Sequence, residues 1–350
     1  MLSIVIPTKN RGAFLERLLS YYSAQNLKEP LLVADSSDSD RIAEVRRAVD
    51  LGSKHLTIDY RSYDRRTTFD EKLTSVLGLV STEFAVIGAD DDFFSILGLQ
   101  RAVDFLRANA DFSVAHGSAL TFELPPSAVY GDGMRIAHYA QRSIEHQTAA
   151  ERLTDYLSRY STLWYSVHRT AELLKNLRRV ADLQTDPARF TELLPGCLAV
   201  IQGKAKNLEG LYMVRQVHIQ PRGHPSFSDW VNNADWAPRR TRFETCVTEA
   251  LAKKDKISAD AARVIVEHAF ESYVSQAREW NQRRMSRLSL SLKWLKAELA
   301  RYVPRLPVLW QQGRSLLPGE NNQVLLSALL RPSSPYHADF MPIYRAITQT

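Results

Sequence analysis

Three consecutive aspartates at positions 90–92 follow the apolar run of residues 84–89, and their side chains could hold a divalent cation. A short apolar run that stops abruptly is typical of a buried strand in a parallel sheet. Ligands of open α/β sheets bind outside the carboxyl ends of such strands. Adjacent carboxylates repel unless a cation or a proton relieves them, and Mg²⁺ or Mn²⁺ commonly shares its coordination with substrate phosphates. The alternative is a solvated acidic loop at the positive end of the next helix.

Two further polar clusters follow predicted strands, one at residues 8–11 and one at residues 35–37. The first contains Thr8, Lys9, Asn10 and Arg11. Lys9 and Arg11 could approach a diphosphate, and arginine can present two donors at once. Asp35, in the second cluster, could accept a hydrogen bond from a base or a ribose hydroxyl. Because parallel strands end at one edge of a sheet, the three clusters together predict a nucleotide-diphosphate site.

Alternating strand-like and helix-like patterns in the first ~120 residues predict βαβ units and a mainly parallel sheet. The predicted strands are residues 2–6, 31–34, 56–60, 84–89 and 113–122. The predicted helices are residues 12–24, 42–49, 69–80 and 97–106.

Beyond two prolines at positions 125 and 126, the periodic pattern is weaker. Thr148 and Glu151 form a capping-box signature before a helix that we expect to reach about residue 160. The remaining predictions are strands at 162–168 and 211–219, a helix at 190–202, a long loop at 221–240, a basic helical region at 241–302 and an irregular tail.

The composition is that of a folded protein without membrane-spanning segments. The 350 residues are 45% hydrophobic and 24% charged, with a net charge of +6, which favours anionic partners. Two cysteines, Cys197 and Cys246, make neither a disulfide framework nor a zinc site. The first residues contain neither a basic leader nor a long apolar segment, and no apolar run is long enough to span a bilayer. We therefore expect no signal peptide and a cytoplasmic location. No nucleic-acid-binding motif is present.

The three clusters together resemble those of family 2 glycosyltransferases. The resemblance lies in residues 3–11 (SIVIPTKNR), 32–40 (LVADSSDSD) and 89–92 (ADDD). It implies the GT-A fold, in which a mainly parallel sheet flanked by helices binds a nucleotide-sugar donor. The similarity covers roughly residues 1–220. We therefore predict a GT-A catalytic domain at 1–235 and a mostly helical, basic extension at 236–350.

The resemblance also implies roles for individual residues. Pro7 and Thr8 match the loop that lines the nucleotide base, and Asp35 matches the acid that binds the base. Residues 90–92 match the Asp-x-Asp metal motif, in a register that makes Asp90 and Asp92 the metal-binding pair, and Asp90 and Asp91 are also expected to contact the donor. The other register places Gly88 at the position of the first aspartate. In either register, Asp91 or Asp92 is the expected direct ligand. The family's second cluster usually has Asp-Gly or Asn-Gly where this chain has two serines.

The catalytic base is expected to be a carboxylate. In the family, a Glu-Asp pair at a helix start precedes a glycine by about eleven residues, and Glu192 stands at that distance from Gly203. Leu193 occupies the position of the pair's aspartate, which leaves Asp186 as the next candidate. The alternative is that Glu192 is an ordinary surface glutamate in the first turn of a helix.

Four further residues have both a functional and a structural interpretation. His218, after a predicted strand, could be a third metal ligand or a diphosphate contact, or could simply face solvent. Trp164 and Tyr165 lie where family members build the acceptor pocket, or they are core aromatics. Lys72 could point at phosphate, although a solvated lysine is the default.

Residues 283–314 contain eight basic side chains and one acidic side chain, with an apolar stripe that includes two tryptophans. A basic amphipathic helix of this kind indicates peripheral contact with an anionic membrane face. The alternative is a helix that packs on the catalytic domain or on a dimer partner.

The sequence thus predicts a metal-dependent glycosyltransferase that uses Mn²⁺ or Mg²⁺. The acceptor would be a saccharide or a lipid-linked or protein-linked glycan, as in surface polysaccharide synthesis, and the resemblance implies inversion at the anomeric carbon. The alternatives are a sugar nucleotidyltransferase and a non-catalytic binding protein with the same fold. A homodimer remains open.

Overall fold

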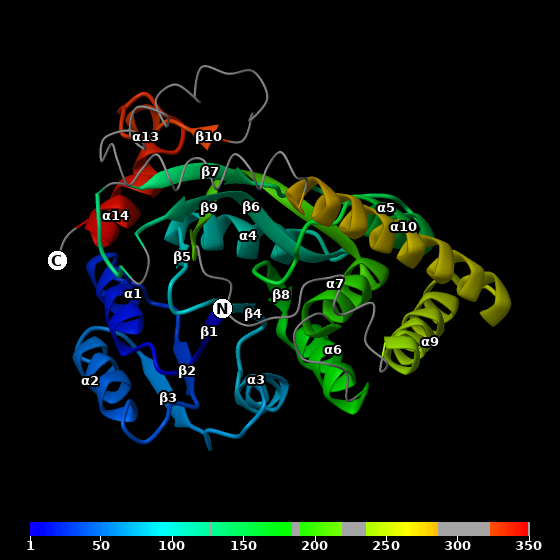
Figure 1. Cartoon of the computed structure of the whole chain (residues 1–350), viewed down its shortest axis with the longest axis horizontal. Helices are drawn as coiled ribbons and strands as arrows, with labels where there is room; N and C mark the ends of the chain where they lie inside the picture. Colours follow the sequence, from blue (N-terminus) through cyan, green and yellow to red (C-terminus); the bar gives the residue numbers. More distant parts are fainter. Residues whose placement is uncertain (126–127, 133, 184–189, 219–235, 286–322, 349–350) are drawn as a thin grey trace.

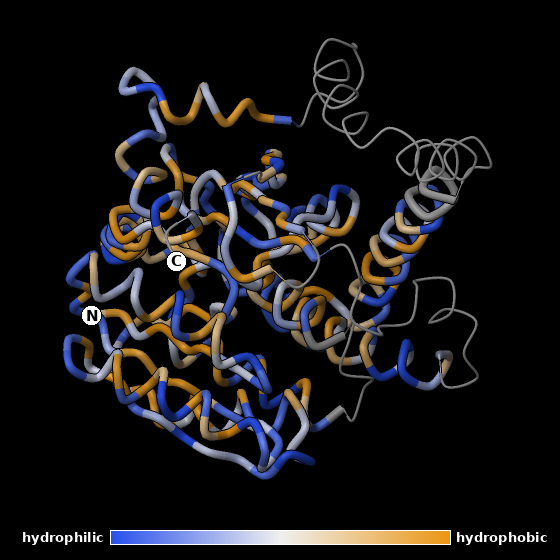
Figure 2. Tube along the Cα trace, turned by 60° about the vertical axis from the view of Figure 1, so that its left-hand side comes forward, coloured by the Kyte–Doolittle hydropathy of each residue, from blue (hydrophilic) through white to orange (hydrophobic). Residues whose placement is uncertain are grey.

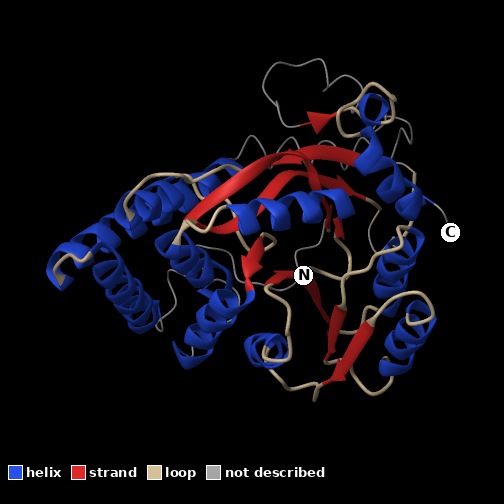
Figure 3. Cartoon of the chain, turned by 180° about the vertical axis from the view of Figure 1, so that it is seen from behind, coloured by secondary structure: helices blue, strands red, loops and turns tan. Residues whose placement is uncertain are grey.

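The computed structural model describes residues 1–350 except 126–127, 133, 184–189, 219–235, 286–322 and 349–350. Within the described residues, one mixed β-sheet runs through the molecule and helices pack on both of its faces (Figure 1). Figure 3 shows the same arrangement from behind. The α/β class predicted from the sequence is therefore confirmed.

Four parallel strands form the amino-terminal part of the sheet, in the order β3-β2-β1-β4. They are β1 (Leu2–Thr8), β2 (Leu31–Asp35), β3 (Ile58–Ser62) and β4 (Phe84–Ile87). The register places Thr8 beside Asp35 and Val5 beside Ile87. The residues that follow β1, β2 and β4 therefore leave the sheet at one edge, as the strand pattern predicted.

Alternate residues of the parallel strands face two different cores, because side chains alternate along a strand. Ile4 and Ile6 of β1 belong to a core shared with α1 (Gly12–Ala24), α2 (Ile42–Gly52) and α4 (Ile96–Ala108). Val5 belongs to a core shared with α3 (Phe69–Leu77) and α6 (Thr170–Leu183). Helices thus cover both faces of these strands, which explains their continuous apolar sequences.

The sheet continues from β4 through mostly antiparallel strands. These are β8 (Val167–Arg169), β6 (Phe112–Glu123), β7 (Arg135–Tyr139) and β10 (Gln323–Val324). A long strand, β9 (Lys204–Val217), runs parallel to β6 and also pairs with the two-residue strand β5 (Phe93–Phe94). Because β5 directly follows the aspartate triplet, its pairing with β9 brings residues 215–218 to the triplet.

A second group of helices forms its own apolar core beside the sheet. It consists of α5 (Ala149–Ser158), α7 (Phe190–Gln202), α9 (Trp236–Asp255) and α10 (Ala259–Met285). The capping box predicted at Thr148 and Glu151 is confirmed at the start of α5. Figure 2 shows the mixed hydrophilic and hydrophobic colouring along these helices, as expected where one face packs on a core. Among the described helices, none is both long enough and apolar enough to cross a bilayer.

Several predicted elements differ in the structure. Of the strand predicted at 162–168, only the last two residues are in a strand, β8 (Val167–Arg169), because residues 164–166 form a turn. The predicted loop at 221–240 falls largely on residues 219–235, outside the described part, and α9 already begins at Trp236. In the described part of the predicted helical region 241–302, α9 and α10 are separated near Lys256, which has a φ of 55°.

Residues 286–322 are not described, and they include most of the basic amphipathic segment predicted at 283–314. Helix α6 and strand β7 were not anticipated from the sequence.

The carboxyl-terminal helix α14 (His337–Thr348) packs on the amino-terminal core. Phe340, Ile343 and Ile347 are fully buried there, against α1, α4 and β9. Ser95 lies three residues after the aspartate triplet, and its hydroxyl donates a hydrogen bond to Asp339 of α14. The last described helix thus contacts the first residues of α4 and supports the part of the sheet that carries the polar clusters.

We expect Phe340→Ala to lower the free energy of unfolding by about 3–5 kcal/mol, because it removes a fully buried ring and leaves a cavity. Leu325→Ala is the matched control, since Leu325 is 61% exposed and should change stability by less than about 0.5 kcal/mol. Urea denaturation of the three proteins measures both effects. Equal stability of the Phe340 variant and the control would show that α14 does not contribute to the core.

Candidate functional site

The loops that follow β1 and β2 are joined by Asn10. Its backbone N–H donates to the Ser37 hydroxyl at 2.7 Å, and its side-chain amide donates to Asp38 at 2.6 Å. In return, the Asp38 backbone N–H donates to the side-chain oxygen of Asn10 at 2.8 Å. Asn10 has a φ of 59°, a left-handed conformation that asparagine tolerates better than most residues. Asn10, predicted to bind the donor, therefore holds two of the three clusters together.

Lys72, on α3, contacts the end of β1 and the loop that follows β2. Its ammonium group donates to the Thr8 carbonyl oxygen at 2.9 Å and to the Ser36 hydroxyl at 2.8 Å. Only 3% of the residue is exposed, so the solvated default is wrong. Burial lowers the pKa of Lys72 to about 8, against the opposing effect of nearby Asp35. A buried cation at the end of β1 favours an anionic ligand in this region.

Asp35 lies at the end of β2 and is completely buried. One carboxylate oxygen accepts hydrogen bonds from the backbone N–H and hydroxyl of Ser37, at 2.8 and 2.5 Å. The other accepts from the Tyr60 hydroxyl at 2.8 Å. Tyr60 is half-buried on β3 and was not anticipated as a site residue. A base bound near Asp35 would therefore also meet the Tyr60 ring. The predicted base-binding roles of Asp35 and of Pro7, which pairs with Ala34, remain predictions.

Arg11 bridges the first two aspartates of the triplet. Its two terminal nitrogens donate to different carboxylates, one to Asp90 and one to Asp91, the latter at 2.6 Å. Asp90 also accepts from the Thr8 hydroxyl at 2.7 Å, which ties the end of β1 to the segment after β4. The Nε2 atom of His218 lies 2.7 Å from Asp91. Although burial opposes it, hydrogen bonds from His218 and Arg11 hold the pKa of Asp91 below its ordinary value.

Asp92 has different hydrogen-bond partners from Asp90, and they lie on β9. It is 2% exposed and accepts from the backbone N–H of Gln216 at 2.9 Å and from Arg215 Nε at 3.2 Å. Burial raises the pKa of Asp92 to about 6, in spite of the opposing charge of Arg215. Asp92 thus fastens the end of β9 beside the triplet.

Arg17 lies directly behind the triplet and is 1% exposed. One terminal nitrogen donates to the Asp91 carbonyl oxygen at 3.1 Å and to the Gln216 side chain at 2.8 Å. Its guanidinium also stacks over the ring of Phe93 at 4.9 Å. Burial lowers the pKa of Arg17 to about 10. The sequence analysis missed this residue, although helical spacing places it between Phe14 and Tyr21 on one aromatic face.

Arg215 connects the triplet to the predicted catalytic base. Its guanidinium lies between the rings of Tyr139 and Tyr165, at 4.8 and 4.3 Å, and donates to the Tyr165 hydroxyl at 2.8 Å. Although burial lowers it, the pKa of Arg215 is raised by Tyr165, Asp92, Tyr139 and Glu192 together. The charge of Glu192 therefore acts on this part of the site.

Glu192 is half-buried in the first turn of α7, where its carboxylate accepts a hydrogen bond from the Tyr160 hydroxyl at 3.1 Å. Tyr160 packs against the rings of Tyr156 and Tyr273, so the Glu192 carboxylate lies beside a group of aromatic side chains. Desolvation raises the pKa values of the partly buried Tyr160 and Tyr165, and the charge of Glu192 raises them further. Asp186, the other candidate base, lies outside the described residues. Trp164 stacks on Phe69 with ring centroids 6.0 Å apart.

As arranged, the aspartate triplet does not fit a divalent ion. Each carboxylate already accepts hydrogen bonds from protein groups, and two of those groups are guanidiniums. In the described part of the chain, no three or more His, Cys, Asp or Glu side chains converge as metal ligands. The ligand set of Asp90, Asp92 and His218 stays a prediction.

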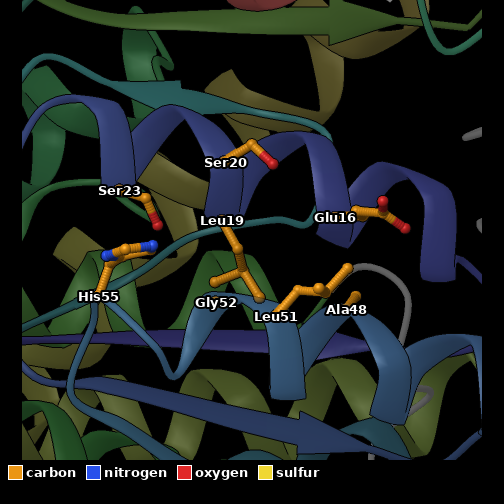
Figure 4. A pocket seen from close by; sticks show the side chains of 8 residues that line it. All are labelled: Glu16, Leu19, Ser20, Ser23, Ala48, Leu51, Gly52 and His55. Atoms are coloured by element: carbon orange, nitrogen blue, oxygen red, sulfur yellow. The ribbon is translucent and has the colours of Figure 1, made fainter.

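A separate pocket of about 220 Å³ lies between α1 and α2 (Figure 4). It is lined by Glu16, Leu19, Ser20, Ser23, Ala48, Leu51, Gly52 and His55. None of these residues belongs to the three polar clusters. The pocket is therefore distinct from the candidate site.

No protein-family model and no curated protein matches this chain. Solved structures to which it is similar include residues 1–349 of TarS from S. aureus in complex with UDP-GlcNAc, with 14% identity and a TM-score of 0.44. That match covers 82% of this chain and 93% of the other. Another is the mannosyltransferase PcManGT from Pyrobaculum calidifontis in complex with GDP-Man and Mn²⁺, with 15% identity, coverage of 87% and 81%, and a TM-score of 0.39. At such low scores, the function proposed below rests on this chain's own residues.

The lowered pKa of Lys72 predicts a pH-dependent stability. The folded protein releases the Lys72 proton near pH 8, whereas the unfolded chain holds it to about pH 10.5, so stability rises with pH between these values. Relative to Lys72→Met, the wild type should gain up to about 3 kcal/mol in unfolding free energy across this window. Urea denaturation at several pH values measures the difference. Lys9→Met, an exposed neighbour, should keep the rise, and a pH-independent difference for Lys72→Met would contradict the burial argument.

Proposed function

We propose that this chain is a glycosyltransferase with the GT-A fold, which transfers a sugar from a nucleotide-diphosphate donor to a hydroxyl of a saccharide or glycoconjugate acceptor. The observation that carries this proposal is the junction of the loops after β1, β2 and β4. Thr8 contacts Asp90, Lys72 contacts Thr8 and Ser36, and Asn10 contacts Asp38. Ligand binding at the carboxyl edge of an open α/β sheet supports the same conclusion.

The junction offers separate groups for the parts of a nucleotide-diphosphate donor. Asp35 and Tyr60 lie together at the end of β2 and are the proposed contacts of the base, with Pro7 and Thr8 lining the loop beside them. Arg11 and Lys72 bring positive charge to the end of β1 and are the proposed contacts of the diphosphate. Neutralising the departing diphosphate lowers the barrier to cleavage of the sugar–phosphate bond.

The acceptor side is proposed to lie toward Glu192 and its surrounding tyrosines. A general base must reach the proton of the acceptor hydroxyl, and Glu192 is a carboxylate near Arg215 and Tyr165. Deprotonation by Glu192 as the acceptor oxygen attacks the anomeric carbon would give inversion, which is also what the family resemblance implies. The half-buried Trp164, stacked on Phe69, is a proposed aromatic surface for the acceptor sugar.

The remaining sequence-based expectations stand as proposals. They are peripheral membrane contact through residues 283–314, a cytoplasmic location, and a catalytic domain at 1–235 with a basic extension at 236–350. Surface polysaccharide or another glycan is the proposed acceptor class.

A panel of UDP-, GDP-, CMP- and TDP-sugars tests the proposed function. A donor that binds only the native state raises the melting temperature, and the effect grows with its concentration. The stabilising donor is then incubated with candidate acceptors, and the products are analysed. Release of nucleoside diphosphate with a new glycosidic bond supports glycosyl transfer. Release of pyrophosphate in a separate incubation with a nucleoside triphosphate and a sugar 1-phosphate would indicate a nucleotidyltransferase. Donor binding without any product would indicate a binding protein.

We expect Glu192→Gln to reduce transfer by about 10²- to 10⁴-fold, because glutamine is nearly isosteric but cannot accept the acceptor proton. Donor affinity should remain close to that of the wild type, since Glu192 lies on the acceptor side. Glu249→Gln, at an exposed position of α9, is the matched control and should leave the rate unchanged. Initial rates and donor titrations measure both properties. A near-normal rate for Glu192→Gln would assign the base to a different residue.

A further inference from the structure

The Arg11 guanidinium lies against two of the three carboxylates that would be needed to bind a divalent ion. A metal shared by Asp90 and Asp91 would take one oxygen from each carboxylate, and Arg11 already donates to one oxygen of each. The third carboxylate does not complete such a site, because Asp92 accepts from Arg215 and from the backbone of Gln216. A divalent ion and the guanidinium therefore compete for the same two carboxylates.

Arg11 is held in this position by groups other than the aspartates. Its guanidinium stacks over the Phe14 ring at 4.2 Å, and only 13% of the side chain is exposed. Arg11 directly follows Asn10 and directly precedes α1. The hydrogen bonds from Asn10 to Ser37 and Asp38 therefore fix the backbone next to Arg11. Packing against Phe14 therefore already restricts the Arg11 side chain, so little further conformational entropy is lost when its guanidinium contacts the aspartates.

The local charges are also balanced without an ion. Arg11 and Arg215 form ion pairs with the triplet, and Arg17 contacts the Asp91 carbonyl oxygen from behind. His218 Nε2 lies 2.7 Å from Asp91 and 3.1 Å from Arg11. Because it donates to the carboxylate, this nitrogen cannot also accept from Arg11, so it adds a further donor to the cluster.

We propose that Arg11 takes the place of a divalent cation in this protein. The guanidinium occupies Asp90 and Asp91, excludes Mn²⁺ and Mg²⁺ from them, and presents the positive charge that a donor diphosphate meets. The exclusion of the ion rests on the contacts of Arg11 and of Asp92, whereas the diphosphate contact rests on the proposed glycosyltransferase function. Nucleoside diphosphates accordingly bind the wild type without a divalent ion.

Binding of Mn²⁺ alone tests the exclusion. The electron paramagnetic resonance signal of free Mn²⁺ is followed during titration of the full-length wild type, Arg11→Gln, Arg11→Lys and the control Arg41→Gln. Arg41 pairs with Glu44 and has a side chain that is 48% exposed. We expect Arg11→Gln to bind Mn²⁺ at least about tenfold more tightly than the wild type, because it removes the competing charge. Arg11→Lys should bind with intermediate affinity, because one ammonium cannot bridge both carboxylates as a guanidinium does.

The control should match the wild type, and circular dichroism shows which variants are folded. Arg11→Lys keeps the test decisive if the glutamine variant does not fold. The proposal is overturned if the wild type binds Mn²⁺ as tightly as the folded Arg11 variants, or if none of those variants gains affinity.

Calorimetry with UDP and GDP tests the diphosphate contact separately. In EDTA the wild type should bind one of these nucleotides, and Arg11→Gln should bind it at least about tenfold more weakly, with affinity restored by Mn²⁺. Wild-type binding that requires Mn²⁺ would overturn the substitution of the ion by Arg11. Absence of nucleotide binding under all conditions would count against the proposed function, while the Mn²⁺ titration would still decide whether Arg11 excludes the ion.

Discussion

Three adjacent carboxylates can be buried at the edge of a sheet only if positive groups are brought to them. Here those groups come from positions that are far apart in the sequence. Arg11 precedes α1, and Arg215 lies near the end of β9. Leaving one such charge buried without its partner costs several kcal/mol, so the position of each element depends on the others. This mutual dependence explains why residues more than 100 positions apart meet at one point. The same positive groups that make the triplet tolerable also make the edge attractive to a diphosphate.

The carboxyl-terminal half of the chain takes part in building this edge. β9 reaches the triplet because β5 pairs with it, and α4 packs close to it at Gly98. A Cβ at Gly98 would lie 2.8 Å from the Leu211 carbonyl oxygen, so only glycine permits this approach. Helix α14 then contacts Ser95 at the start of α4. Together these contacts hold Arg215 against Asp92 on one side and against Tyr139 and Tyr165 on the other.

Local patterns were sufficient to predict the strands β1, β2 and β4 and the clusters that follow them. Those strands are apolar on both faces, and their ends are marked by abrupt changes to polar residues. The patterns could not show that Asp92 points inward, because that depends on the pairing of β5 with β9. They likewise could not show that Lys72 is buried, since its partners Thr8 and Ser36 belong to two separate loops. Trp164 and Tyr165 fall in the predicted strand 162–168, but they lie in a turn that is closed by a hydrogen bond from the Ser166 backbone N–H to the Leu163 carbonyl oxygen.

A crystal structure with a bound nucleotide-diphosphate sugar tests the central claim most directly. The account predicts that the diphosphate contacts Arg11 beside the aspartate triplet, with the base near Tyr60 and the sugar directed toward Arg215 and Glu192. A donor bound elsewhere, such as in the pocket between α1 and α2, would contradict it. So would a donor held at the triplet by a metal ion with Arg11 turned away from both carboxylates.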